Sequence, residues 1–156
     1  MFSSILCPLD FSVHSELALD YAIKLATLTK AHVTVVHVVE TLLAAGAEAA
    51  GSRETLTTQT QREIQEMLAR LAPGVNDSRL GISIVVGEPS DQILRHIDDC
   101  QADLVVMGTQ GLEGAKRFMF GSTTERVLRE SRVPVLAVPA PPESAKKLPA
   151  GAAPRS

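Results

Sequence analysis

The residues of this chain best suited to bind a ligand lie in positions 108–124, the glycine-rich loop, which follows an apolar segment and precedes a helical pattern. Three glycines allow a backbone to approach an anion closely because they carry no side chain: Gly108, Gly111 and Gly121. Ser122 and Thr123 add hydroxyl donors, and a helix that starts there would present unpaired N–H groups with a partial positive charge. The loop therefore predicts a phosphate-binding site.

The glycine spacing matches neither of two common nucleotide-binding motifs. The Walker phosphate loop ends in Gly-Lys-Ser or Gly-Lys-Thr, and the dinucleotide fingerprint places Gly-x-Gly-x-x-Gly after the first strand. From the residues alone two interpretations stay open. The loop forms an anion site from backbone donors and a helix start, or its glycines only shape a long connection in which Ser122 is a plain helix cap.

Short apolar segments alternate with helical patterns along the chain. Segments with the composition of buried strands span residues 4–9, 32–39, 82–86, 104–107 and 134–138. Apolar residues at helical spacing predict a helix from 13 to about 28 with Ser12 as its cap, a helix ending at Pro73, a helix after Pro89 and a helix after the loop. Residues 42–58, rich in Ala, Gly and Thr, are interpreted either as a loop or as a loosely formed helix start.

This alternation predicts an α/β fold with an open parallel sheet and helices on both faces. Ligands of such folds bind beyond the carboxyl ends of the strands, where the winding reverses. Asp10 follows the first strand and Gly108 the fourth, so a sheet with these strands adjacent places both residues at one crevice. The Pro, Ala, Ser and Lys composition of residues 140–156 predicts a disordered tail after a single domain at 1–139.

The amino-acid composition argues against some classes of binding partner. The chain has 156 residues, 45% of them hydrophobic and 21% charged, and a formal net charge of −3, which argues against nucleic acid as the main partner. No apolar run approaches the roughly 20 residues of a membrane span, and the start of the chain lacks the blocks of a secretion signal. We expect no nucleic-acid or membrane partner and a cytoplasmic location. Cys7 and Cys100 are expected to be buried, reduced thiols.

Two motifs together resemble the universal stress protein family. They are the spacing Gly108-x2-Gly111-x9-Gly121-Ser122 and the opening Pro8-Leu9-Asp10-Phe11-Ser12, and the likeness covers residues 2–139. The resemblance implies a Rossmann-like sheet of five parallel strands in the order 3-2-1-4-5. It also implies that the chain binds ATP and forms a homodimer through its last strand.

By position, the resemblance implies contacts to one bound adenine nucleotide. The residues beside the adenosine would be Pro8, Asp10 and Val38, with Val38 at the adenine. The residues at the ribose and phosphates would be Met107, Gly108, Gly111, Gly121, Ser122 and Thr123. The last three of these would hold the phosphates through N–H and hydroxyl donors.

The residue types at several of these positions affect the role expected for Asp10 and the affinity expected for the nucleotide. Asp10 suits ribose hydroxyls better than Mg²⁺, because a bare carboxylate repels a triphosphate. Leu112 and Glu113 stand where relatives often carry a basic residue. Lys116 and Arg117 could compensate, but a solvated loop pair that contributes little is the favoured interpretation. Affinity is therefore expected to be modest, or shifted towards AMP or ADP.

Three hypotheses of function follow. The first is an ATP-binding stress-response module without fast turnover. The second is a slow ATPase or phosphotransferase, which would need a positioned general base and a cation clamp on the phosphates. The third is a dimeric interaction module with weak or no nucleotide binding.

Overall fold

The structure is a computed structural model, described for residues 1–49, 51–75, 77–110 and 120–139. Its centre is a sheet of five parallel strands in the order β3-β2-β1-β4-β5, which confirms the predicted order. The strands are β1 (Ser4–Pro8), β2 (His32–Val39), β3 (Leu80–Val86), β4 (Leu104–Gly108) and β5 (Val135–Val138). β1 and β4 are neighbours, so the turns that follow them lie at the same edge of the sheet.

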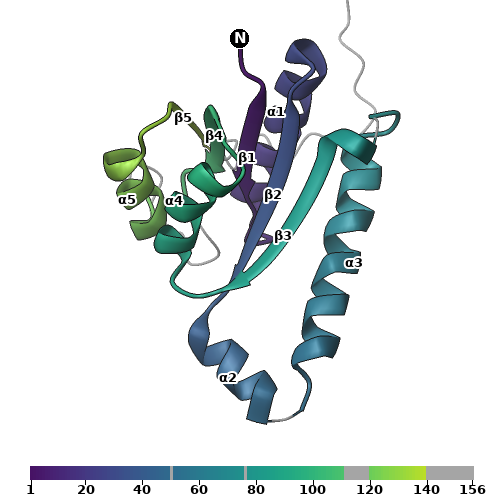
Figure 1. Ribbon diagram of the computed structural model, residues 1–156, viewed down its shortest axis with the longest axis vertical. Coiled ribbons are helices and arrows are strands. Elements are labelled where there is room, and N and C mark those ends of the chain that lie inside the picture. The colour runs from purple at the N-terminus through teal and green to yellow at the C-terminus, as the bar shows by residue number, and fades with distance from the viewer. Residues whose placement is uncertain (50, 76, 111–119, 140–156) are drawn as a thin grey trace, which may run out of the picture.

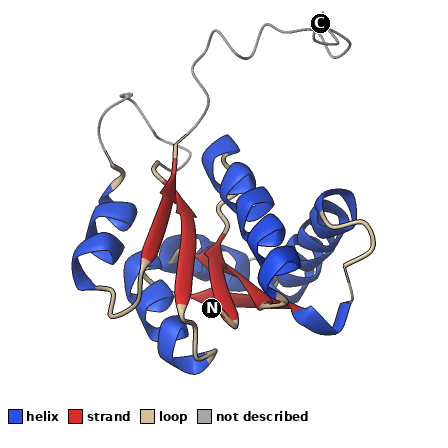
Figure 2. Ribbon diagram, turned by 90° about the horizontal axis from the view of Figure 1, so that it is seen from above, coloured by secondary structure: helices blue, strands red, loops and turns tan. Residues whose placement is uncertain are grey.

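Helices cover both faces of the sheet (Figures 1 and 2). They are α1 (Val13–Thr29), α2 (Thr41–Ala49), α3 (Arg53–Leu71), α4 (Pro89–Asp99) and α5 (Ser122–Glu130), with a short 3-10 turn η1 at Asp77–Arg79. α1 and α3 pack on one face, and α4 and α5 pack on the other. None of the described helices is both long and apolar enough to cross a membrane.

Each face of the sheet carries its own core. In β1, Ile5 and Cys7 point to the α1 and α3 side while Leu6 points to the α4 and α5 side, as the two-residue period of a strand requires. Complete burial raises the pKa of Cys7 to about 12, which makes this thiol unreactive. Cys100 is only half-buried, so the expectation that both thiols are buried was wrong for Cys100.

Within the described part of residues 42–58, residues 42–49 belong to α2 and residues 53–58 form the start of α3. α2 lies beyond the carboxyl end of β2, and α3 runs back along the sheet (Figure 1). The apolar positions by which α3 packs on the core begin only at Ile64 and continue with Met67 and Leu68. Because the preceding turns of α3 are mostly polar, the sequence signal for a helix starts later than the helix does.

Candidate functional site

The turn between β1 and α1 holds Asp10 in a fixed position. Its Oδ1 accepts the N–H of Ser12 at 3.0 Å, and its own N–H donates to Ser15 Oγ at 3.3 Å. Ser12 caps α1 as predicted, since its Oγ accepts the N–H of Ser15 at 3.2 Å. Phe11 turns the chain with a left-handed φ of 62°, which is uncommon for a residue other than glycine. One carboxylate oxygen of Asp10 is thus used by the turn.

The end of β2 presents a backbone donor and acceptor to the space beyond β1. The carbonyl of Val36 accepts the N–H of Leu9 at 2.9 Å on the β1 side, and the carbonyl of Val39 accepts the N–H of Gly87 at 3.1 Å on the β3 side. Successive residues of a strand direct their peptide groups to opposite neighbours. Val38 therefore directs its N–H and C=O to the β1 side, past Pro8, where β1 ends.

His37 separates β1 from β2 at this point. Its Nδ1 lies 2.7 Å from the carbonyl oxygen of Leu9, a position that regular pairing would give to the N–H of Val38. A carbonyl only accepts, so Nδ1 carries the proton and donates it. The imidazole also lies 5.1 Å from the ring of Phe11, centroid to centroid. This side chain therefore satisfies the carbonyl of Leu9, just after β1, and among the described residues the peptide of Val38 is left without a partner on this side.

The two ends of the glycine-rich loop are fastened to each other. The N–H of Gly121 donates to the carbonyl of Thr109 at 2.8 Å, and the N–H of Thr109 donates to the carbonyl of Val138 at 3.1 Å. The buried hydroxyl of Thr124 donates to the carbonyl of Gly108 at 2.9 Å. These bonds hold the first turn of α5 against the ends of β4 and β5.

The N-terminus of α5 presents N–H groups that no side chain caps. Gly121 precedes the helix in an extended conformation and has no side chain to cap it, and the helical ladder starts with the N–H of Glu125 bonding to the carbonyl of Gly121 at 2.9 Å. The N–H groups of Ser122, Thr123 and Thr124 precede that ladder, and helix geometry gives them no acceptor within α5. Such groups bind phosphate or carboxylate oxygens.

At Gly108 the first turn of α1 leaves no room for a side chain. A Cβ at this position would lie 2.6 Å from the Cβ of His14 and 2.7 Å from its carbonyl carbon. The sequence predicted that side chains are excluded here, and this is correct. The described structure explains the exclusion by the close approach of the first turn of α1 and not by the approach of a ligand.

The predicted site residues meet around one cavity. Its volume is about 940 Å³, within the range of small-molecule sites, roughly 300–1,000 Å³. The residues that the structure brings together there are Pro8, Asp10, Val38, Met107, Gly108, Gly121, Ser122 and Thr123. Gly111 lies outside the described residues, as do Leu112, Glu113, Lys116 and Arg117.

Several walls of this cavity were not predicted from the sequence. They come from helices or lie outside the two motifs, namely Ser15, His37, Leu43, Leu56, Thr60, Pro89 and Ile93. No local pattern marks these residues, because their position depends on how the helices pack. The charged side chains among the described lining residues, Asp10 and Glu40, are both acidic. Phosphate binding at the described surface therefore depends on backbone and hydroxyl donors.

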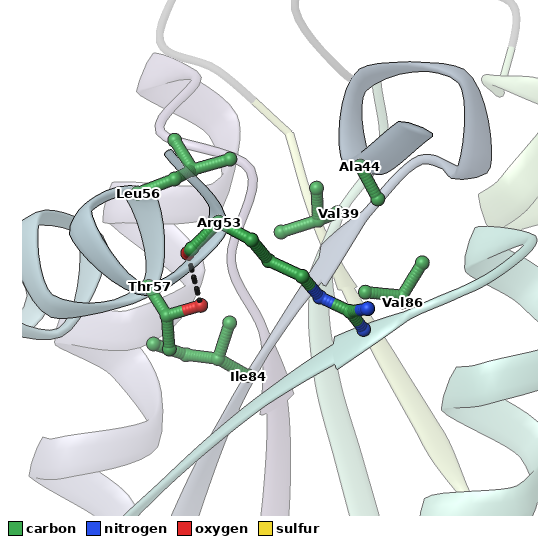
Figure 3. Close-up of a pocket in the computed structure, with 7 residues that line it drawn as sticks. All are labelled: Val39, Ala44, Arg53, Leu56, Thr57, Ile84 and Val86. Atoms are coloured by element: carbon green, nitrogen blue, oxygen red, sulfur yellow. Dashed lines mark hydrogen bonds between the residues drawn. The ribbon is translucent and has the colours of Figure 1, made fainter. Parts of the chain in front are cut away.

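A second, smaller cavity of about 130 Å³ lies between the α2–α3 hairpin and the ends of β2 and β3 (Figure 3). Arg53, which forms an ion pair with Glu48, extends from α3 across this space towards Val86 (Figure 3). Val39 and Leu56 line both cavities. The start of α3 is therefore seated on the last residues of β2, beside the larger cavity.

Arg126 joins α5 to the start of α4. Its Nη1 donates to Glu88 Oε2 at 3.2 Å and to the buried Ser90 Oγ at 2.9 Å, and its Nη2 lies 2.6 Å from Asp91 Oδ1. Partial burial raises the pKa of Glu88, but hydrogen bonds from Ser90 and Asp91 and the charge of Arg126 outweigh it and hold this pKa below its usual value. Since Pro89 and the start of α5 both line the larger cavity, the network fixes two of its walls relative to each other.

The model of the universal stress protein family matches residues 1–139. The chain belongs to this family. Among its relatives, universal stress protein MJ0531 of Methanocaldococcus jannaschii is 32% identical over 143 residues, which cover 90% of this chain and 84% of that protein. MJ0577 of the same organism is 29% identical over 154 residues, covering 88% of this chain and 95% of that protein.

Solved structures show the universal stress protein fold as well. The structure of MJ0577 superposes with a TM-score of 0.76 at 28% identity and covers 92% of this chain and 99% of that one. A universal stress protein solved in complex with cAMP has a TM-score of 0.63 at 24% identity and covers 88% of this chain and 96% of that one. At that identity the second likeness concerns the fold.

Proposed function

We propose that this universal stress protein binds an adenine nucleotide, with ATP as the first candidate, and acts as a regulatory module of the stress response. One observation carries the proposal. A single cavity joins the uncapped N-terminus of α5 to the open peptide of Val38, two groups suited to the two ends of a nucleotide. The adenine pairs with Val38, and the phosphates lie at Gly121, Ser122 and Thr123.

The middle of the nucleotide lies between these ends. Asp10 accepts hydrogen bonds from the ribose, with Pro8, Met107 and Gly108 around it, and Gly111 completes the phosphate end as the family resemblance implies. Asp10 and Glu40 repel phosphates, so the phosphate chain extends towards α5 and away from both. Mg²⁺ then accompanies the phosphates and does not depend on Asp10. With fewer phosphates, AMP and ADP meet less of this repulsion.

The nucleotide acts as a signal and is not turned over rapidly. Phosphoryl transfer needs a base that positions the nucleophile. Asp10, the carboxylate closest to this role, already accepts the N–H of Ser12 with one oxygen and is better placed to orient a ribose. Turnover that is abolished by Asp10→Ala while binding is retained would instead support a slow ATPase or phosphotransferase.

Equilibrium titration of the purified protein tests the proposal. The ligands are ATP, ADP, AMP and adenosine, each with and without Mg²⁺, and cAMP joins them because a protein of this fold was crystallised with it. We expect saturable binding below millimolar concentration. Absence of binding at millimolar concentration of every nucleotide would refute the proposal and favour an interaction module with an empty cavity.

We further propose a homodimer joined through β5. This strand is at the edge of the sheet, and its Leu136 is 38% exposed, so leaving it bare would invite association. Light scattering at micromolar concentration is expected to give the mass of two chains, and the mass of one chain would contradict the dimer. A cytoplasmic location without a nucleic-acid partner belongs to the same proposal.

A further inference from the structure

Thr60 is a polar residue of the cavity wall to which neither motif assigns a role. It lies in α3, is 7% exposed and lines the larger cavity. Every described side-chain oxygen or nitrogen that is itself buried has a hydrogen-bond partner, so a hydroxyl of this wall that lacks one must be open to the cavity.

Three other threonines in the helices satisfy their hydroxyls within the helix. Those of Thr27, Thr29 and Thr57 donate to the carbonyl four residues earlier, at 2.8, 2.9 and 3.1 Å. Thr60 makes no such bond, and within the described parts of the chain its hydroxyl has no hydrogen-bond partner. This hydroxyl is therefore free to bond with a molecule in the cavity.

The surroundings of Thr60 place it at the base end of the cavity. Leu56, one helical turn earlier, lines the small cavity together with Val39, the last residue of β2 (Figure 3). Val39 directly follows Val38, whose peptide group is open. Leu43 and Leu56 give this part of the wall an apolar surface. Apolar walls with a few fixed polar groups are typical of sites that bind a flat ring.

We infer that the hydroxyl of Thr60 forms a hydrogen bond with the base of the bound nucleotide, so that the α2–α3 hairpin supplies a specificity-determining wall of the site. This inference rests on the proposed function. The bond concerns the base alone, so it contributes equally to the binding of adenosine, AMP and ATP. Thr60 and the start of α5 then serve opposite ends of the ligand.

The test compares Thr60→Val, which replaces the hydroxyl by a methyl group of similar size, with the wild type. We expect affinity to fall about 3- to 10-fold for adenosine, AMP and ATP alike, the loss typical of one neutral hydrogen bond. Thr60→Ser keeps a hydroxyl and is expected to bind within about twofold of the wild type. Thr57→Val, which loses a bond inside the same helix, is the matched control and is expected to bind like the wild type.

Three outcomes would overturn the inference. If the wild type binds no nucleotide, the proposed function fails and the inference fails with it. If the wild type binds and Thr60→Val binds equally well, or loses affinity for ATP alone, only the inference fails. Thermal unfolding of each variant shows whether it is folded. If Thr60→Val does not fold, Thr60→Ser is compared with Thr60→Ala. The inference is then supported only if Thr60→Ser keeps its affinity for adenosine, AMP and ATP while Thr60→Ala loses affinity for all three.

Discussion

Replacing Gly108 by alanine tests the interpretation that α1, and not a ligand, excludes a side chain at the end of β4. The new Cβ would lie 2.6 Å from the Cβ of His14 and 2.7 and 2.9 Å from its carbonyl carbon and oxygen, whereas ordinary contacts are 3.4–4 Å. Two of these three atoms belong to the backbone of α1, so no rotamer change of His14 relieves the contact. α1 and β4 must move apart by roughly 1 Å to restore a normal carbon–carbon separation.

The cost of that movement follows from what the two elements hold together. α1 and β4 both contribute to the larger core, through residues such as Leu19 and Val106 that are completely buried. Overpacking in such a core costs about 1–3 kcal/mol. We expect Gly108→Ala to be in the upper half of that range because the clash involves backbone. For a chain of this size, a loss of about 2–3 kcal/mol lowers the unfolding temperature by roughly 4–12 °C.

Thermal and urea unfolding measure this loss, and two other glycines serve as controls. A Cβ at Gly81 would have its closest neighbour at 3.6 Å, so Gly81→Ala is expected to change stability little. Gly46, inside α2, has no atom within 4 Å of such a Cβ, and Gly46→Ala is expected to stabilise by about 0.5–1 kcal/mol. If Gly108→Ala unfolds at the wild-type temperature but no longer binds nucleotide, the glycine serves the ligand and the packing explanation is refuted.

Three further predictions concern the site and the fold. Gly121→Val is expected to abolish nucleotide binding while the protein stays folded, because its extended backbone accepts a β-branched residue; wild-type affinity in the folded variant would contradict this. Arg126→Met is expected to weaken ATP binding more than adenosine binding, since it frees α5 from α4; equal losses would argue against it. Burial raises the pKa of Asp103, but the N–H groups of Ser3 and Ser4 donate to its carboxylate and the net pKa is lowered. Its contribution to stability is therefore complete above about pH 4 and is lost as the pH falls through the lowered pKa. Asp103→Asn should make stability less dependent on acid below pH 4, and an unchanged pH profile would count against this.

Much of the fold could be predicted because its determinants are local. Apolar, β-branched runs bounded by turn residues gave all five strands, although β3 starts at Leu80 and not at Ile82. Ser12 was recognised as a cap because its hydroxyl bonds only three residues ahead. The strand order, in contrast, came from the family resemblance, since no local pattern tells which strands are neighbours.

The unpredicted parts of the site depend on contacts between segments far apart in the sequence. Glu88 and Arg126 are 38 positions apart, and nothing near either residue marks it as the partner of the other. Nothing near Gly108 in the sequence indicates that His14 of α1 packs against it. Thr60 has no role in the sequence analysis, because only the packing of α3 places it in the wall of the cavity.

In the proposed site, affinity for phosphates and selectivity for the base depend on different ends of the cavity. N–H groups at a helix start attract any anion of suitable size, so under the proposed function the first turn of α5 would distinguish ATP from adenosine but not ATP from GTP. Discrimination between bases must come from the other end, where the peptide of Val38 fixes one donor and one acceptor and Thr60 offers an adaptable hydroxyl. Asp10 and Glu40, the acidic side chains of the described wall, repel phosphates and so disfavour a phosphate chain that points away from α5. The proposed function therefore predicts one favourable orientation of the nucleotide in the cavity, with the base at β2 and the phosphates at α5, although few of the contacts that would fix it are charged.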